Sequence, residues 1–268
     1  PRAELGYNDP KLKVPIGDLM PAEIRAKSLI GNDLSLPPGF RLVTLREVGD
    51  AFAYAKAHAA ELGAGTLVFV GRFDLSEFAV VLEPDEPLAT ARRAFYIAMS
   101  ALADTLAAHA PPEKAVEFVW PDALRVDGGL VGGGQFAWSD GAEDAPPAWM
   151  VFGAMIRTVS IGESEPGLRP LISALEEEGF DGLGASELAG NFTRHLMTSV
   201  DRWQEEGFDA IAKDYLSRLV PEKGGSRSIA DNGDLLIRRI GKADVERRDL
   251  ISALATPSWL DAETRGPR

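Results

Sequence analysis

The chain has 268 residues, no cysteine and a formal net charge of −13, from 28 Lys and Arg against 41 Asp and Glu. This length suits one large domain with a small appendix, and the lack of cysteine excludes disulfides, thiolate nucleophiles and cysteine-held metal sites. The negative charge argues against a nucleic-acid or anionic-membrane binder. The sequence has no run of 18 apolar residues, so no membrane span is predicted. Without a signal-peptide pattern, we expect a cytoplasmic protein.

Residues 1–39 are predicted to form an N-terminal extension. Six prolines punctuate this stretch and disfavour regular structure, so only residues 21–27 are typical of a short helix. Two interpretations stay open, a tail that lies on the surface and an arm that binds a partner.

Regular elements are predicted from Phe40 onward. Alternating apolar residues indicate strands, and apolar residues spaced three or four apart indicate helices. The first half of the chain is predicted to contain a strand at 40–45, a helix at 50–62, strands at 66–70 and 77–83, and a long helix at 88–109.

The second half continues with strands and then changes to helices. The predicted elements are a strand at 116–119, a hairpin at 124–131 turning at Asp127-Gly128, strands at 135–138 and 149–161, and helices at 171–178, 186–206 and 208–219. A turn at 231–234 is then predicted between two β runs, the second of them at 235–237. This order indicates an α+β fold, a mixed β-sheet flanked by helices with a small C-terminal β segment. We expect a main domain at 40–220 and a small C-terminal domain at 221–268.

Several common catalytic patterns are absent from the sequence. It has no GxxxxGK phosphate loop, no GxGxxG after a strand and no GxSxG nucleophile elbow. The three histidines are far apart in sequence, so no metal site is predicted.

Three stretches resemble the biotin/lipoate protein ligase family. Residues 118–134, FVWPDALRVDGGLVGGG, are similar to the family's Lys-Trp-Pro-Asn-Asp core and the hairpin that follows it. Residues 205–211 resemble its Gly-Phe helix, and residues 229–237 its C-terminal Gly-Ile-Asp-x-x-Gly-x-Leu-Leu hairpin. Residues 257–261 are similar to the short C-terminal domain of divergent alphaproteobacterial-type members. The resemblance implies the family's catalytic-domain fold and its chemistry, in which ATP activates a carboxylic acid for transfer to a carrier lysine.

The chain departs from the family at the positions that carry this chemistry. The adenylating lysine aligns with Leu130, or with Gly129 after a shift of one residue, and neither residue can offset the charge that develops on the acyl-phosphate. The glycine- and arginine-rich phosphate loop is reduced to Gly71-Arg72. Arg157 takes the place of an asparagine at the nucleotide end. These changes together predict that ordinary adenylation is lost.

The resemblance also implies a set of ligand-binding residues. Arg72 and Arg157 stand at family active-site positions, where guanidinium groups can bind a carboxylate or phosphate; the alternative is that they are surface or ion-paired arginines. For the other candidates two interpretations are also open. The residues after strand 116–119 can form a wall against the ligand or a packed tryptophan and a turn, and the glycines can let a ligand approach the backbone or form a strand bulge. These candidates are Trp120, Pro121, Asp122, Gly132 and Gly133.

We therefore expect a divergent biotin/lipoate ligase-like protein that binds a small carboxylic acid such as biotin, lipoate or octanoate. The lack of cysteine excludes the octanoyltransferase branch, which needs a cysteine nucleophile. ATP and magnesium are expected as cofactors only if ligase activity is retained, and an acyl-carrier domain protein would then be a partner. The alternative is a non-catalytic relative that binds a small molecule or a protein.

Overall fold

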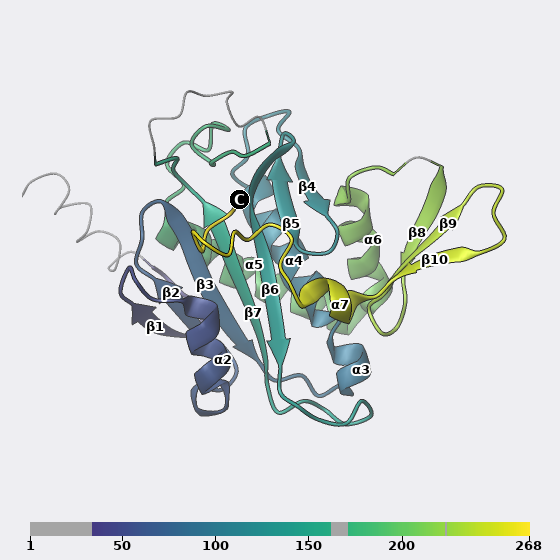
Figure 1. The fold of residues 1–268 in the computed structure, drawn as a ribbon. Coiled ribbons are helices and arrows are strands. Elements are labelled where there is room, and N and C mark those ends of the chain that lie inside the picture. The colour runs from purple at the N-terminus through teal and green to yellow at the C-terminus, as the bar shows by residue number, and fades with distance from the viewer. Residues whose placement is uncertain (1–33, 162–170, 223) are drawn as a thin grey trace, which may run out of the picture.

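The structure, a computed structural model, describes residues 34–161, 171–222 and 224–268. A seven-stranded mixed sheet carries helices on both faces, and a separate three-stranded sheet lies beside it (Figure 1). The predicted α+β fold is confirmed. The predicted helix at 21–27 falls outside the described residues.

The large sheet has the strand order β1-β2-β3-β7-β6-β5-β4. Only β1 and β2 pair in parallel, and the other neighbours are antiparallel. The strands are β1 (Arg41–Leu45), β2 (Thr66–Val70), β3 (Leu75–Leu82), β4 (Val116–Val119), β5 (Ala123–Val126), β6 (Gly129–Trp138) and β7 (Met150–Arg157).

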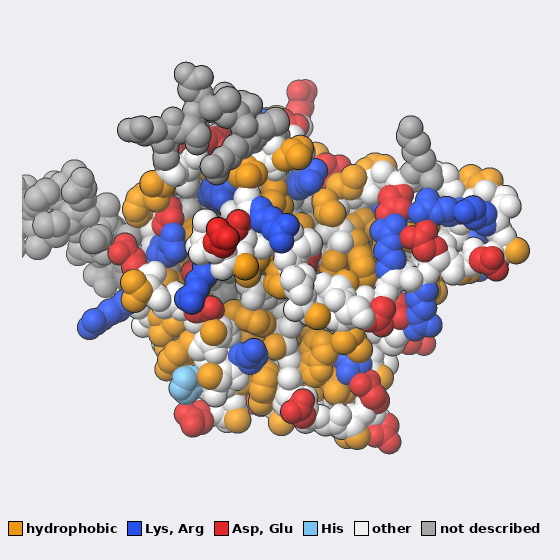
Figure 2. All heavy atoms as spheres, in the orientation of Figure 1, with side chains coloured by type: hydrophobic (Ala, Val, Ile, Leu, Met, Phe, Trp, Pro, Cys, Tyr) orange, Lys and Arg blue, Asp and Glu red, His pale blue; other side chains and the backbone are white. Residues whose placement is uncertain are grey.

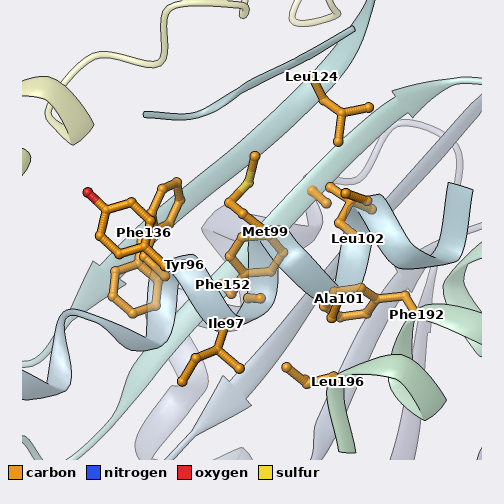
Figure 3. Close-up of a cluster of buried hydrophobic side chains, with 14 of the residues drawn as sticks. Tyr96, Ile97, Met99, Ala101, Leu102, Leu124, Phe136, Phe152, Phe192 and Leu196 are labelled. Atoms are coloured by element: carbon orange, nitrogen blue, oxygen red, sulfur yellow. The ribbon is translucent and has the colours of Figure 1, made fainter. Parts of the chain in front are cut away.

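One face of the sheet, called the helix face here, is covered by α4, α5 and α6. The helices of this layer are α3 (Leu88–Ala91), α4 (Ala94–Ala107), α5 (Ala185–Glu206) and α6 (Phe208–Arg218). Figure 3 shows apolar side chains of α4 and α5 meeting those of the strands in the main core. The predicted helix at 88–109 is divided, because the Arg92 and Arg93 carbonyls accept from amides three residues on rather than four.

The opposite face, called the open face here, is covered by α2 (Ala51–Leu62) and by the end of the chain (Figure 1). Three buried alanines let α2 lie close to the strands. Asp50 caps the helix by accepting the Ala53 N–H at 2.8 Å, and Gly63 ends it at a φ of 69°.

The predicted hairpin between β5 and β6 is confirmed. Its turn residues Asp127 and Gly128 have φ values of 49° and 84°. Two successive positive φ angles are what a two-residue turn between twisted antiparallel strands requires.

The predicted helix at 171–178 is wrong, because this stretch pairs with strand ends instead. Leu130 N–H donates to the Leu171 carbonyl at 2.9 Å, and Ser173 N–H donates back to Leu130 at 3.0 Å. Leu175 N–H donates to the Arg157 carbonyl at 3.0 Å. Backbone groups used in this way are not available for helical bonds.

The small antiparallel sheet contains β8 (Gly225–Ile229), β9 (Leu235–Arg239) and β10 (Val245–Arg248), and α7 (Leu250–Leu254) follows it. The strand β10 and the helix α7 were not predicted from the sequence. After α7 the chain returns across the open face (Figure 1). We call residues 256–268 the C-terminal segment. The division at residue 220 stays a prediction.

Candidate functional site

The open face is where most of the predicted ligand-binding residues lie, and the C-terminal segment crosses it. Figure 2 shows acidic and basic side chains gathered there, above a band of apolar side chains. The segment and the strands under it form the candidate site.

Trp259 docks the C-terminal segment onto the sheet. Its side chain is 0% exposed and packs with Leu75, Ala123 and Met155. Its indole Nε1 donates to the Gly134 carbonyl at 3.0 Å. A tryptophan from the chain's own end therefore fills the part of the sheet where β5, β6 and β7 meet.

Gly133 makes room for this indole. A Cβ at Gly133 would lie 2.4 Å from two indole atoms of Trp259 and 2.1 Å from the Asp122 carbonyl oxygen. At Gly132, where φ is 151°, a Cβ would lie 1.9 Å from the Met155 carbonyl oxygen. Both glycines thus permit close approach, Gly133 to a side chain of this chain and Gly132 to a neighbouring strand.

Asp122 holds the C-terminal segment from below. Its carboxylate is 0% exposed and accepts two hydrogen bonds from Ser258, one from the backbone N–H at 2.9 Å and one from the hydroxyl at 2.6 Å. Burial raises the pKa of Asp122 above its usual value, although the bonds from Ser258 act in the opposite direction. Asp122 is therefore an anchor for the segment.

The C-terminal segment closes on itself as a short antiparallel turn. Arg268 N–H donates to the Trp259 carbonyl at 2.8 Å, and Leu260 bridges Pro267. Arg157, at the end of β7, donates from Nη2 to the Pro267 carbonyl at 2.5 Å. The segment is fastened at both of its ends, by Trp259 and by Arg157.

A cavity of about 690 Å³, called the Arg72 cavity here, lies between α2, the sheet and the C-terminal segment. Arg72, Glu77 and Gln135 line it from the sheet side, and Leu260 and Arg265 from the segment. Its size falls within the range of small-molecule sites.

Two polar groups of the Arg72 cavity, Arg72 and Glu77, have pKa values above their usual ones. Arg72 donates to Asp74 from Nε at 3.0 Å and from Nη2 at 2.6 Å, which raises the pKa of its guanidinium. The Glu77 carboxylate is buried and accepts the Ala51 N–H at 2.9 Å. Burial raises the pKa of Glu77, so this side chain holds a proton to a higher pH than an exposed glutamate does.

The two predicted arginines are brought together. Arg72 and Arg157 both line a second cavity of about 250 Å³ beside the Arg72 cavity, and Arg268 lines it too. Arg72 lines both cavities and so lies where they adjoin.

Trp120 and Pro121 face the helix layer and line neither of these cavities. The indole Nε1 of Trp120 donates to the Tyr96 hydroxyl at 3.1 Å. The Pro121 carbonyl accepts from the Tyr215 hydroxyl at 2.7 Å, and the peptide bond between Trp120 and Pro121 is cis. Of the seven predicted residues, only Arg72 and Arg157 line these two cavities, and Asp122, Gly132 and Gly133 line neither of them.

Sequence reasoning missed three groups of the site. Glu77 and Gln135 are polar residues in strands whose neighbours are mostly buried, and that interruption is the signal that could have found them. Arg265 gave no local signal, because its place follows from contacts of the C-terminal segment with residues far away in the chain.

A family model described as the biotin/lipoate A/B protein ligase family matches residues 36–217. The chain belongs to this family. No match was found among curated proteins. Within the part of the chain that the structure describes, no helix is long and apolar enough to cross a membrane, and no three His, Asp or Glu side chains are grouped to hold a metal ion.

Solved structures of the family agree with this fold. A biotin protein ligase-like protein of unknown function from Silicibacter sp. tm1040 is 26% identical, with a TM-score of 0.71, covering 83% of this chain and all of its own. The biotin protein ligase of Aquifex aeolicus is 14% identical, with a TM-score of 0.58, over 78% of this chain and 99% of its own. That of Leishmania major, in complex with biotin, is 16% identical, with a TM-score of 0.50, over 80% and 99%.

Proposed function

We propose that this biotin/lipoate ligase-family protein binds a small carboxylic acid of the biotin, lipoate or octanoate type in the Arg72 cavity. The observation that carries the proposal is a cavity of about 690 Å³ whose lining combines the arginines Arg72 and Arg265 with apolar side chains. Arg72 can bind the acid's carboxylate through the guanidinium hydrogens that Asp74 leaves free. Phe52 and Leu260 offer apolar contacts for the body of the acid.

The residues present do not fit Mg-ATP held in the family's usual way. Leu130, at the position of the adenylating lysine, packs against the cluster around Trp259. Two arginines line the Arg72 cavity, which can serve a single carboxylate but not the several charges of a triphosphate, because four carboxylates line it as well: Glu47, Asp50, Glu77 and Asp261. We therefore assign no adenylation step to this chain, and transfer to an acyl-carrier domain is not part of the proposal.

The second candidate is a relative that binds a protein partner instead of a small molecule. It is favoured by one observation, namely that Trp259 already fills the surface beside Gly133, where the family resemblance predicts the ligand. On this hypothesis the C-terminal segment replaces the ligand.

A thermal-shift screen separates these candidates. Biotin, lipoate and octanoate are each added with and without Mg-ATP, and octanamide serves as a control that lacks the carboxylate. An acid that binds the folded state raises the melting temperature, by an amount that grows with its concentration. We expect a shift with acid alone. A shift that needs acid and Mg-ATP together would contradict the absence of adenylation, and no shift with any acid would refute acid binding.

Calorimetric titration of two variants then tests the site. Replacing Arg72 with alanine removes a charge-assisted hydrogen bond and is expected to weaken acid binding roughly ten- to a hundredfold. The matched control is Arg238→Ala, which removes an exposed arginine from β9 in the small sheet. Equal losses in both variants would show only a general effect of charge.

A further inference from the structure

Arg265 is a second cation of the Arg72 cavity, and its guanidinium makes no bond to any residue that the structure describes. The side chain is exposed and lines the cavity, and it has no hydrogen bond or ion pair with any residue that the structure describes. Arg72, which lines the same cavity, is fixed by Asp74. The cavity is thus lined by one guanidinium that is bonded to a carboxylate, that of Arg72, and by one that is not bonded to any described residue, that of Arg265.

None of the four acids that line the cavity forms an ion pair with Arg265, and three of them accept backbone amides. Asp50 and Glu77 each accept an N–H from the first turn of α2, at 2.8 and 2.9 Å. Asp261 accepts two N–H groups of its own turn, at 2.8 and 2.9 Å. Only Glu47 lines the cavity without such a bond among the described residues. The guanidinium is therefore left for another anion.

The backbone of Arg265 is in a conformation that favours glycine. Its φ is 55°, and its N–H donates to the Asp261 carbonyl at 2.9 Å, which closes the turn. A non-glycine residue in the left-handed region carries a steric cost that glycine avoids. An arginine at such a position points to a use for its side chain.

The attachment of the C-terminal segment fixes where Arg265 lies. The buried Trp259, the Ser258 bonds to Asp122 and the Arg157 bond to Pro267 hold both sides of its turn. These contacts hold the turn in place, so it forms a fixed part of the cavity lining.

We propose that Arg265 is a ligand-binding residue that receives the carboxylate of the acid together with Arg72, and that the C-terminal segment is a fixed wall of the cavity. This inference rests on the proposed function. It assigns the charge that the family's lysine would supply to a different element of the chain, one that arrives from beyond the family-matched residues 36–217.

The decisive variant is Arg265→Gly, because it removes the guanidinium and relieves the backbone at the same time. The acid that wild type binds, among biotin, lipoate and octanoate, is titrated calorimetrically into the variant. We expect affinity to fall roughly ten- to a hundredfold, with an unchanged or higher melting temperature. Arg265→Lys keeps the charge and is expected to lose less, and Arg238→Ala is the matched control.

Truncation after residue 256 tests the wall. We expect the truncated chain to lose acid binding while circular dichroism shows that it remains folded. Tighter binding by the truncated chain would overturn the proposal, since the segment would then be a plug. If truncation prevents folding, the Arg265→Gly result decides alone. Equal acid affinity in wild type and Arg265→Gly overturns this inference and leaves the proposed function standing, whereas no binding by wild type overturns both.

Discussion

The two faces of the large sheet are covered in different ways. On the helix face, α4 and α5 lay periodic apolar side chains against the strands and form one continuous core (Figure 3). On the open face, α2 covers one part with alanines, and the C-terminal segment covers another with a single tryptophan. The helix face is built for stability by many similar contacts, whereas the open face depends on a few specific ones around a cavity.

The largest effect is expected from Trp259→Ala. This change removes the aromatic side chain that docks the C-terminal segment, and loss of a fully buried tryptophan typically costs about 3–5 kcal/mol of unfolding free energy. Urea denaturation measures it. The control is Trp203→Ala, a half-buried tryptophan of α5, for which we expect a smaller loss. A loss below about 1 kcal/mol at Trp259 would contradict the docking of the segment.

Ser258→Ala is expected to have the next largest effect and to depend on pH. At neutral pH the hydroxyl donates to a charged carboxylate, so its loss costs roughly 1.5–3 kcal/mol. The pKa of Asp122 is raised, and as pH falls through it the bond becomes one to a neutral acid, worth roughly 0.5–1.5 kcal/mol. The difference in unfolding free energy between wild type and variant should therefore shrink towards acid pH. The exposed Ser252→Ala is the control, and a difference independent of pH would contradict a titration of Asp122 within the range measured.

Tyr215→Phe tests the assignment of Trp120 and Pro121 to the helix face. The change removes the hydroxyl that donates to the Pro121 carbonyl, at a cost of about 1 kcal/mol in unfolding free energy. Affinity for the acid is expected to stay the same, because Tyr215 is buried among Tyr96 and Phe118, away from the Arg72 cavity. Altered acid binding would show that the two faces are coupled.

The smallest effect is expected from Glu77→Gln. The amide keeps an acceptor for the Ala51 N–H but cannot ionise. Because burial raises the pKa of Glu77 in the folded state, wild type loses stability as pH rises from the usual glutamate range through that raised value. The variant should lack this loss, so it should match wild type at low pH and be slightly more stable at neutral pH. Parallel pH profiles of the melting temperature would contradict this.

The sequence predicted the helix face better than the open face, and the physical reason is range. Asp127-Gly128 determines its hairpin through the conformations of two adjacent residues, and the helix at 186–206 follows from spacings of three and four. The helix predicted at 171–178 is wrong because its backbone groups bond to the ends of strands instead. Arg72 and Arg157 could be placed at one site only through family motifs. Arg265 could not, because its position depends on contacts across most of the chain.

Those long-range contacts bear on the order in which the molecule assembles. The bonds that close the open face join residues 136, 125 and 110 positions apart: Ser258 with Asp122, Trp259 with Gly134, and Pro267 with Arg157. Contacts of such separation carry a large loop-closure entropy and form after local ones. During synthesis, every strand of both sheets leaves the ribosome before residues 256–268 do. The strands of both sheets are therefore synthesised before the segment that closes the Arg72 cavity, and we expect the contacts of this segment to form after those of the helix face.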